Sequence, residues 1–207
     1  MLPHKHPILK IFIAIACFFT GIYLLTRYQN PKAYPNSVST LATGVLVSAS
    51  ASPAAEIQAH APDGTANLIQ RTKISADQSK TYSFFAADVD GKNQQQIFTR
   101  TVSPVASMSI PFNAWAPDNK TVFLEENDGV AKKYLVVKVS GERFSKNEQF
   151  LEVAGLWGEK KMDYVLDTVT GWASPTLLIL TTKKEDGSKG PNYWFEIPSR
   201  SFLILAS

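Results

Sequence analysis

The sequence predicts an all-β fold of antiparallel sheets, preceded by one N-terminal transmembrane helix. Three observations carry this prediction. Short runs of apolar, β-branched and aromatic residues fill the chain beyond residue 80, and Asp-Gly dipeptides separate several of them. Near the N-terminus, by contrast, the residues from Ile11 to Leu25 form a single uncharged apolar run. The chain therefore combines a membrane segment with a strand-rich domain.

The apolar run is long enough to cross a membrane only when its flanks are included. Spanning a hydrocarbon core of about 30 Å takes about 20 helical residues. A span from Ile8 to Tyr28 meets this length, because Lys10 can extend its ammonium group to the headgroups. We expect a single-pass anchor in the cell membrane, with a short cytoplasmic tail and an extracytoplasmic C-terminal domain.

Three alternatives to an uncleaved anchor stay open at this point. Ala14-Ile15-Ala16 has the small-x-small form of a signal cleavage site, although the apolar Cys17-Phe18-Phe19 continues beyond it. Cys17, preceded by Ala16, could accept a lipid, and a buried core helix is the third alternative. The continuous apolar run favours the anchor over cleavage.

Composition divides the chain into three parts: tail and anchor (1–28), a tether rich in Pro, Ser and Ala (29–66), and a β domain (67–207). Four of the 21 basic residues precede residue 33, which leaves 17 basic side chains against all 18 acidic ones. This near-neutral balance makes nucleic acid a poor candidate partner. The only cysteine lies in the apolar run, so the β domain cannot contain a disulfide.

Individual strands can be placed from hairpin signals. The expected strands Thr81–Val89 and Thr121–Asn127 are each followed directly by Asp-Gly, at positions 90–91 and 128–129. This dipeptide supplies the positive φ of tight hairpins. The other expected strands are Gln94–Val102, Lys132–Gly141, Thr176–Thr182 (central and buried), Asn192–Pro198, Ser201–Leu205 and, within the tether, Leu41–Val47. Lys146–Val169 is the one segment without a strand pattern. Its apolar spacing allows a helix, although glycines at positions 155 and 158 disfavour one.

Two segments of the domain repeat one pattern, and a third echoes it. Units that begin at Trp115 and Trp172 each run from Trp-Ala through a proline turn, an apolar strand and an acidic hairpin to an aromatic strand. A fainter copy begins at Ser75. The phrases Trp115–Phe123 and Asp88–Thr99 resemble the WD40-like repeat of TolB-type and dipeptidyl-peptidase-type β-propellers.

The resemblance implies blades of four antiparallel strands over Ser75–Leu205. A closed propeller normally needs at least four blades, and about three irregular units fit this chain. We therefore expect an incomplete propeller-like stack or an open sandwich of antiparallel sheets.

Few residues offer catalytic or metal-binding chemistry. His4, His6 and His60 all precede the predicted domain, which argues against a Ser-His-Asp triad and against histidine-ligated zinc. Asp88, Asp90 and Asn93 could hold calcium, but Asp-Gly favours a hairpin turn. An acid–base pair formed by Asp163 and Asp167 lacks a partner group. We expect no enzyme activity, no metal and no cofactor.

Aromatic residues are the remaining candidates for recognition: Trp115, Trp157, Trp172, Tyr193 and Trp194. Such residues more often form the core of a β domain. Trp157 is the predicted binding residue, because it lies beside glycine in the irregular segment and function concentrates in loops.

The expected function is a membrane-anchored binding or scaffolding module. The membrane is its expected partner through the N-terminal helix, and an envelope protein, peptide or glycan is its expected ligand. A carboxylate-based hydrolase related to peptidases and a structural envelope component are the alternatives.

Overall fold

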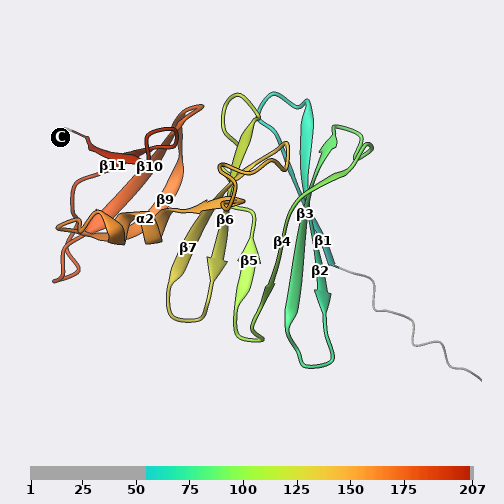
Figure 1. The fold of residues 1–207 in the computed structure, drawn as a ribbon, viewed down its shortest axis with the longest axis horizontal. Coiled ribbons are helices and arrows are strands. Elements are labelled where there is room, and N and C mark those ends of the chain that lie inside the picture. The colour runs from blue at the N-terminus through green and yellow to red at the C-terminus, as the bar shows by residue number, and fades with distance from the viewer. Residues whose placement is uncertain (1–54, 206–207) are drawn as a thin grey trace, which may run out of the picture. The chain divides into compact units, whose positions relative to one another are not determined.

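The computed structural model describes residues 55–205, which belong to one compact unit and form three four-stranded antiparallel sheets (Figure 1). Strands follow one another in chain order within each sheet, so each sheet is a simple meander. The first sheet contains β1 (Ala55–His60), β2 (Ala66–Ile74), β3 (Lys80–Asp88) and β4 (Gln95–Val102). The middle sheet contains β5 (Ser107–Ser109), β6 (Thr121–Asn127), β7 (Lys132–Lys138) and β8 (Phe150–Glu152). The third contains β9 (Val165–Ser174), β10 (Leu177–Lys183), β11 (Tyr193–Glu196) and β12 (Ser201–Ile204).

The prediction of a mostly β fold with antiparallel sheets is confirmed, and the Asp-Gly hairpins lie where the sequence places them. Gly91 and Gly129 have φ of 72° and 92°, values that residues with a side chain rarely adopt. Both hairpins join neighbouring antiparallel strands, β3 to β4 and β6 to β7. The three sheets do not close into a ring within the described residues.

Two hydrophobic clusters hold the sheets together, and the middle sheet contributes to both. In β6, Val122 and Leu124 belong to the cluster shared with the first sheet, whereas Phe123 belongs to the cluster shared with the third. This alternation follows from the period of two in a strand. It explains why the centre of each strand, Val122–Leu124 in β6 and Tyr134–Val137 in β7, is continuously apolar, since both faces are buried there.

A buried ion pair also joins the first and middle sheets. Arg100 in β4 approaches the carboxylate of Glu126 in β6, with Nε 2.6 Å from Oε2. The Glu126 side chain is only 6% exposed, so this carboxylate depends on the arginine for its charge compensation.

The repeat is more regular than predicted, and its first copy is in a different place. His60-Ala61-Pro62-Asp63 precedes β2 as Trp115-Ala116-Pro117-Asp118 precedes β6, and each strand is the second of its sheet. The turns share the same hydrogen bonds, such as Ala61 N–H to Ala66 O and Ala116 N–H to Thr121 O, both 2.9 Å. The predicted copy at Ser75 is wrong in register, because it precedes the third strand of its sheet.

Each repeat tryptophan bonds to the sheet before it. The indole N–H of Trp115 donates to Ala59 O at 3.1 Å, and that of Trp172 donates to Ala114 O at 3.0 Å. Ala59 and Ala114 directly precede the aromatic position of their own repeat copies. One bond type thus joins successive sheets at equivalent positions.

The irregular segment forms a short helix. Helix α2 spans Val153–Glu159 and buries Val153 and Trp157. Phe150 and Leu151, which the sequence also places on the helical face, belong instead to strand β8. Strand β10 lies inside its sheet as predicted for Thr176–Thr182, but it alternates between buried and half-buried residues.

Several predictions concern residues outside 55–205: the anchor from Ile8 to Tyr28, lipidation of Cys17, and a strand at Leu41–Val47. Within the described residues, no helix has the length and apolar character needed to cross a membrane. The folded part begins before residue 67, because β1 pairs with β2 over residues predicted as tether. Main-chain bonds hold this strand, since most of its side chains are exposed and give little sequence signal.

Candidate functional site

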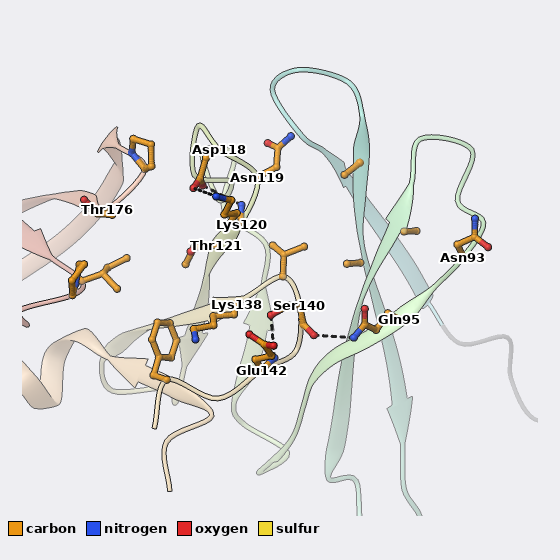
Figure 2. A pocket seen from close by; sticks show the side chains of 18 of the residues that line it. Asn93, Gln95, Asp118, Asn119, Lys120, Thr121, Lys138, Ser140, Glu142 and Thr176 are labelled. Atoms are coloured by element: carbon orange, nitrogen blue, oxygen red, sulfur yellow. Dashed lines mark hydrogen bonds and ion pairs between the residues drawn. The ribbon is translucent and has the colours of Figure 1, made fainter. Parts of the chain in front are cut away.

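A cleft of about 830 Å³ crosses one end of all three sheets, at the start of β2, β6 and β10 (Figure 2). We call this the cleft end of the domain. Its lining combines amide, hydroxyl and charged side chains with small apolar ones. The lining residues are Ala66, Ala86, Ala87, Asn93, Gln95, Asp118, Asn119, Lys120, Thr121, Lys138, Val139, Ser140, Glu142, Phe144, Pro175, Thr176, Ile197, Pro198 and Arg200.

The proline turn before β6 forms one wall of the cleft. Asp118 Oδ1 accepts a hydrogen bond from the Lys120 main-chain N–H at 3.1 Å, which closes a tight side-chain turn. Asn119 has φ of 58°, a conformation that asparagine tolerates better than most residues. The Lys120 side chain is 82% exposed and lies 4.0 Å from Asp118, so its ammonium group stays available to a ligand.

The loop after β7 forms the opposite wall and joins two sheets. Gln95 in the first sheet donates from Nε2 to Ser140 O at 2.8 Å, as Figure 2 shows. Gly141 has φ of 72°, and a side chain there would lie 3.4 Å from Gln96 O. Glycine therefore allows the loop to lie directly against the first sheet.

Lys138 gives the cleft a cation without a carboxylate partner. Its ammonium group donates to Arg143 O at 3.0 Å and lies 5.2 Å from the centre of the Phe144 ring. No carboxylate of the described residues lies within ion-pair distance of it. Arg200, in contrast, is paired with Glu148 at 2.5 Å.

Hydrogen-bonding groups make up much of the lining of the cleft. Thr121, Thr176 and Ser140 supply hydroxyl groups, which can donate and accept. The amide nitrogens of Asn93, Gln95 and Asn119 already donate to Asp88, Ser140 and Thr65. No histidine or cysteine is among the described residues that line the cleft, and the Ser140 hydroxyl accepts a hydrogen bond from the Glu142 main-chain N–H at 3.3 Å. The arrangement suits a polar, extended ligand held by many hydrogen bonds.

Trp157, the predicted binding residue, lies in the core of the third sheet. It is buried, and its indole N–H donates to Tyr164 O at 2.8 Å. Its ring meets Tyr193 and Phe202 edge-on, each with ring centres 4.9 Å apart. Burial, together with the nearby charges of Tyr164 and Asp163, raises the pKa of the Tyr193 hydroxyl. Trp157 thus has no free ring face, and we do not carry it into the proposed site.

The other aromatic candidates are also mostly structural. Trp115 is buried, and Trp172 packs against Phe123 with ring centres 6.3 Å apart. Both line a second cavity of about 480 Å³ near β9. Trp194 lies half-buried on the opposite face of the third sheet from Tyr193. None of these rings contributes to the larger cleft.

The carboxylate candidates have structural partners. Asp88 accepts hydrogen bonds from Lys92 N–H at 2.6 Å and from the Asn93 side chain at 3.0 Å, which completes the hairpin turn. No cluster of three metal-ligating side chains exists among residues 55–205. Asp167 lies in strand β9 and pairs with Lys183 at 3.4 Å, so the helical spacing assumed for Asp163 and Asp167 does not apply.

The sequence motifs contain several residues of the cleft, but no pattern predicted that they line one. Asp118–Thr121 belongs to the repeat motif and Gln95 to the phrase Asp88–Thr99, whereas Lys138 and Ser140 lie in the predicted strand Lys132–Gly141. In comparisons with known proteins, no family model and no curated protein sequence matches this chain.

Proposed function

We propose that this protein is a membrane-anchored, extracytoplasmic binding or scaffolding module without catalytic activity. Its three sheets correspond to three blades of an incomplete β-propeller-like stack, and the cleft is its binding surface. The observation that carries the proposal is the polar lining of the cleft, with contributions from all three sheets and an unpaired Lys138. Ligand pockets commonly combine a few converging polar groups with apolar walls in this way.

The ligand proposed for the cleft is a polypeptide segment of an envelope protein. Main-chain amides need both donors and acceptors, which the hydroxyl groups of Thr121 and Thr176 and the exposed ammonium group of Lys120 supply. The lining contains one aromatic ring, Phe144, and the Lys138 ammonium group lies near it. A glycan would find no broad aromatic platform here, and this favours the polypeptide.

Site-specific photocrosslinking in living cells tests the proposal with the full chain. A photoreactive amino acid at Ser140 or Thr176 should give discrete protein adducts. The same probe at Glu185, in the hairpin at the other end of β10, is the control. Adding Lys138→Ala should reduce the adducts formed from the cleft positions.

The outcomes separate recognition from nonspecific contact. Adducts at both cleft positions and none at Glu185 support the proposal. Equal labelling at all three positions, or none in the cleft, contradicts it. Hydrolytic activity that Asp163→Asn abolishes would support the hydrolase alternative instead.

A further inference from the structure

The third sheet has one apolar face that no other sheet covers among the described residues. Ile179 in β10, Trp194 in β11 and Leu203 in β12 lie directly across from one another on this face. Ile179 and Trp194 are half-buried, and Leu203 is 47% exposed. Neither of the two hydrophobic clusters that join the sheets contains any of the three. We call these three side chains the open row.

The equivalent row of the middle sheet is a sheet-to-sheet interface. Phe123 in β6, Val136 in β7 and Leu151 in β8 lie directly across from one another, and all three are buried in the cluster shared with the third sheet. In both rows the first member directly follows the residue that pairs with the repeat tryptophan, Trp115 or Trp172. The open row therefore occupies the position at which the next sheet would stack.

The first sheet has the matching apolar positions on its own uncovered face. Ile69 in β2 and Phe85 in β3 lie directly across from each other. They face away from the middle sheet, because the neighbouring Leu68 belongs to the cluster shared with that sheet. Their equivalents in the middle sheet, Leu124 and Leu135, pack toward the first sheet. The two end faces thus have apolar residues at positions that pack together inside the chain.

Polar groups border the apolar pair in both cases. Arg71 lies 4.8 Å from the centre of the Phe85 ring and pairs with Glu56 at 2.9 Å. The equivalent position in the middle sheet is Glu126, whose ion pair with Arg100 joins the first and middle sheets. A charged residue two positions after the apolar one is therefore compatible with stacking.

The hydrogen bond that joins successive sheets has a further acceptor and a further donor at the two end faces. Ala59 O and Ala114 O accept the indole bonds within the chain. Gly171 precedes Trp172 in the same way, so its carbonyl oxygen is the third acceptor position. His60 occupies the aromatic position of the first repeat copy, where it is exposed and its imidazole ring offers an N–H donor.

We infer that the third sheet of one copy of this chain binds the first sheet of a second copy. The open row packs toward Phe85 of the second copy, and its His60 donates to the Gly171 carbonyl oxygen. Such a contact is heterologous, because each copy offers a different face at each of its two ends. A ring of sheets normally needs at least four, and two copies supply six. The expected assembly is a closed dimer, which goes beyond the proposed function of the cleft.

Sedimentation velocity of the full chain in detergent micelles measures the dissociation constant of this dimer. Leu203→Asp places a charge in the open row, and His60→Ala removes the donor at the other face. Each should raise the dissociation constant about tenfold. His60→Trp should lower it, because an indole is the donor in both internal interfaces. Ile74→Asp is the matched control, since Ile74 is an aliphatic residue, 60% exposed, outside both faces.

Mixing the two weakened variants identifies the kind of contact. A Leu203→Asp chain keeps its first-sheet face and a His60→Ala chain keeps its third-sheet face, so unlike chains form one intact contact. The mixture should therefore associate more strongly than either variant alone.

A monomeric wild-type chain overturns the inference, as does a dissociation constant that neither Leu203→Asp nor His60→Ala changes. Weakening by Leu203→Asp without any response to the His60 variants, or without recovery in the mixture, also overturns it, because the contact would then join two third sheets. The photocrosslinking experiment tests the cleft independently of these outcomes.

Discussion

Replacing Gly190 by alanine should strain the third sheet at a defined contact. Gly190 donates its N–H to Thr182 O at 2.8 Å. An added Cβ would overlap the Thr182 hydroxyl and lie 3.0 Å from Tyr164 Cδ1. Thr182 is buried, and its hydroxyl donates to Pro191 O at 2.6 Å. The hydroxyl must therefore move and lose its partner.

The magnitude follows from three contributions. Leaving a buried hydroxyl without its partner costs about 1–3 kcal/mol. Overpacking the site adds about 1–3 kcal/mol. Alanine also reduces the conformational entropy of the unfolded chain, which offsets about 0.4–1 kcal/mol of this destabilisation. Gly190→Ala should thus lower the free energy of unfolding by about 1–5 kcal/mol.

The matched control is Gly158→Ala in helix α2. No atom lies within 4 Å of an added Cβ at Gly158, and alanine favours a helix by about 0.5–1 kcal/mol over glycine. Urea unfolding of the full chain in detergent micelles, followed by tryptophan fluorescence, measures both variants. The reasoning fails if Gly190→Ala stays within about 0.5 kcal/mol of the wild type, or if both variants shift in the same direction.

Two further predictions concern charged groups. Arg100→Ala should lower the free energy of unfolding by about 3–5 kcal/mol, because it leaves the buried Glu126 carboxylate unpaired. Arg71→Ala removes one partner of an exposed ion pair and should lower the free energy of unfolding by under about 1 kcal/mol. Equal urea midpoints for the two variants would contradict this difference. Main-chain N–H groups of Ala131 and Val130, together with Lys133, lower the pKa of Asp128 from 3.8 to about 2. Its stabilising effect should therefore be complete above pH 4 and be lost as pH falls toward 2. An NMR titration midpoint near 3.8 would refute this.

Local sequence chemistry was enough to predict seven of the twelve strands, namely β3, β4, β6, β7, β10, β11 and β12, while β1, β2, β5, β8 and β9 were not predicted. The Asp-Gly turns and the apolar runs of β6, β7 and β10 act over a few neighbouring residues, and the structure has these elements at the predicted places. The first repeat copy escaped prediction because His60 replaces tryptophan and β1 exposes most of its side chains. A copy that lacks its most distinctive residue leaves only Ala-Pro-Asp as a signal.

The cleft could be predicted only in part, because its geometry depends on contacts between distant residues. The bond from Gln95 to Ser140 and the ion pair between Arg200 and Glu148 join segments that no local pattern relates. Trp157 shows the same dependence on distant contacts. The sequence predicts it as a binding residue because it lies beside glycine in the irregular segment, and the structure buries its ring through a short helix.

The indole bonds between sheets have a consequence for how such a chain can change in length. His60, Trp115 and Trp172 occupy one repeat position, at separations of 55 and 57 residues. Each indole N–H bonds to the residue just before the aromatic position of the preceding repeat copy. If a whole sheet is duplicated or deleted, the next indole therefore finds an acceptor at the same repeat position. Related chains are therefore expected to differ in length by multiples of about one such repeat. In a longer chain, the carbonyl group of Gly171, which precedes Trp172 as Ala114 precedes Trp115, would accept the indole bond of a fourth sheet.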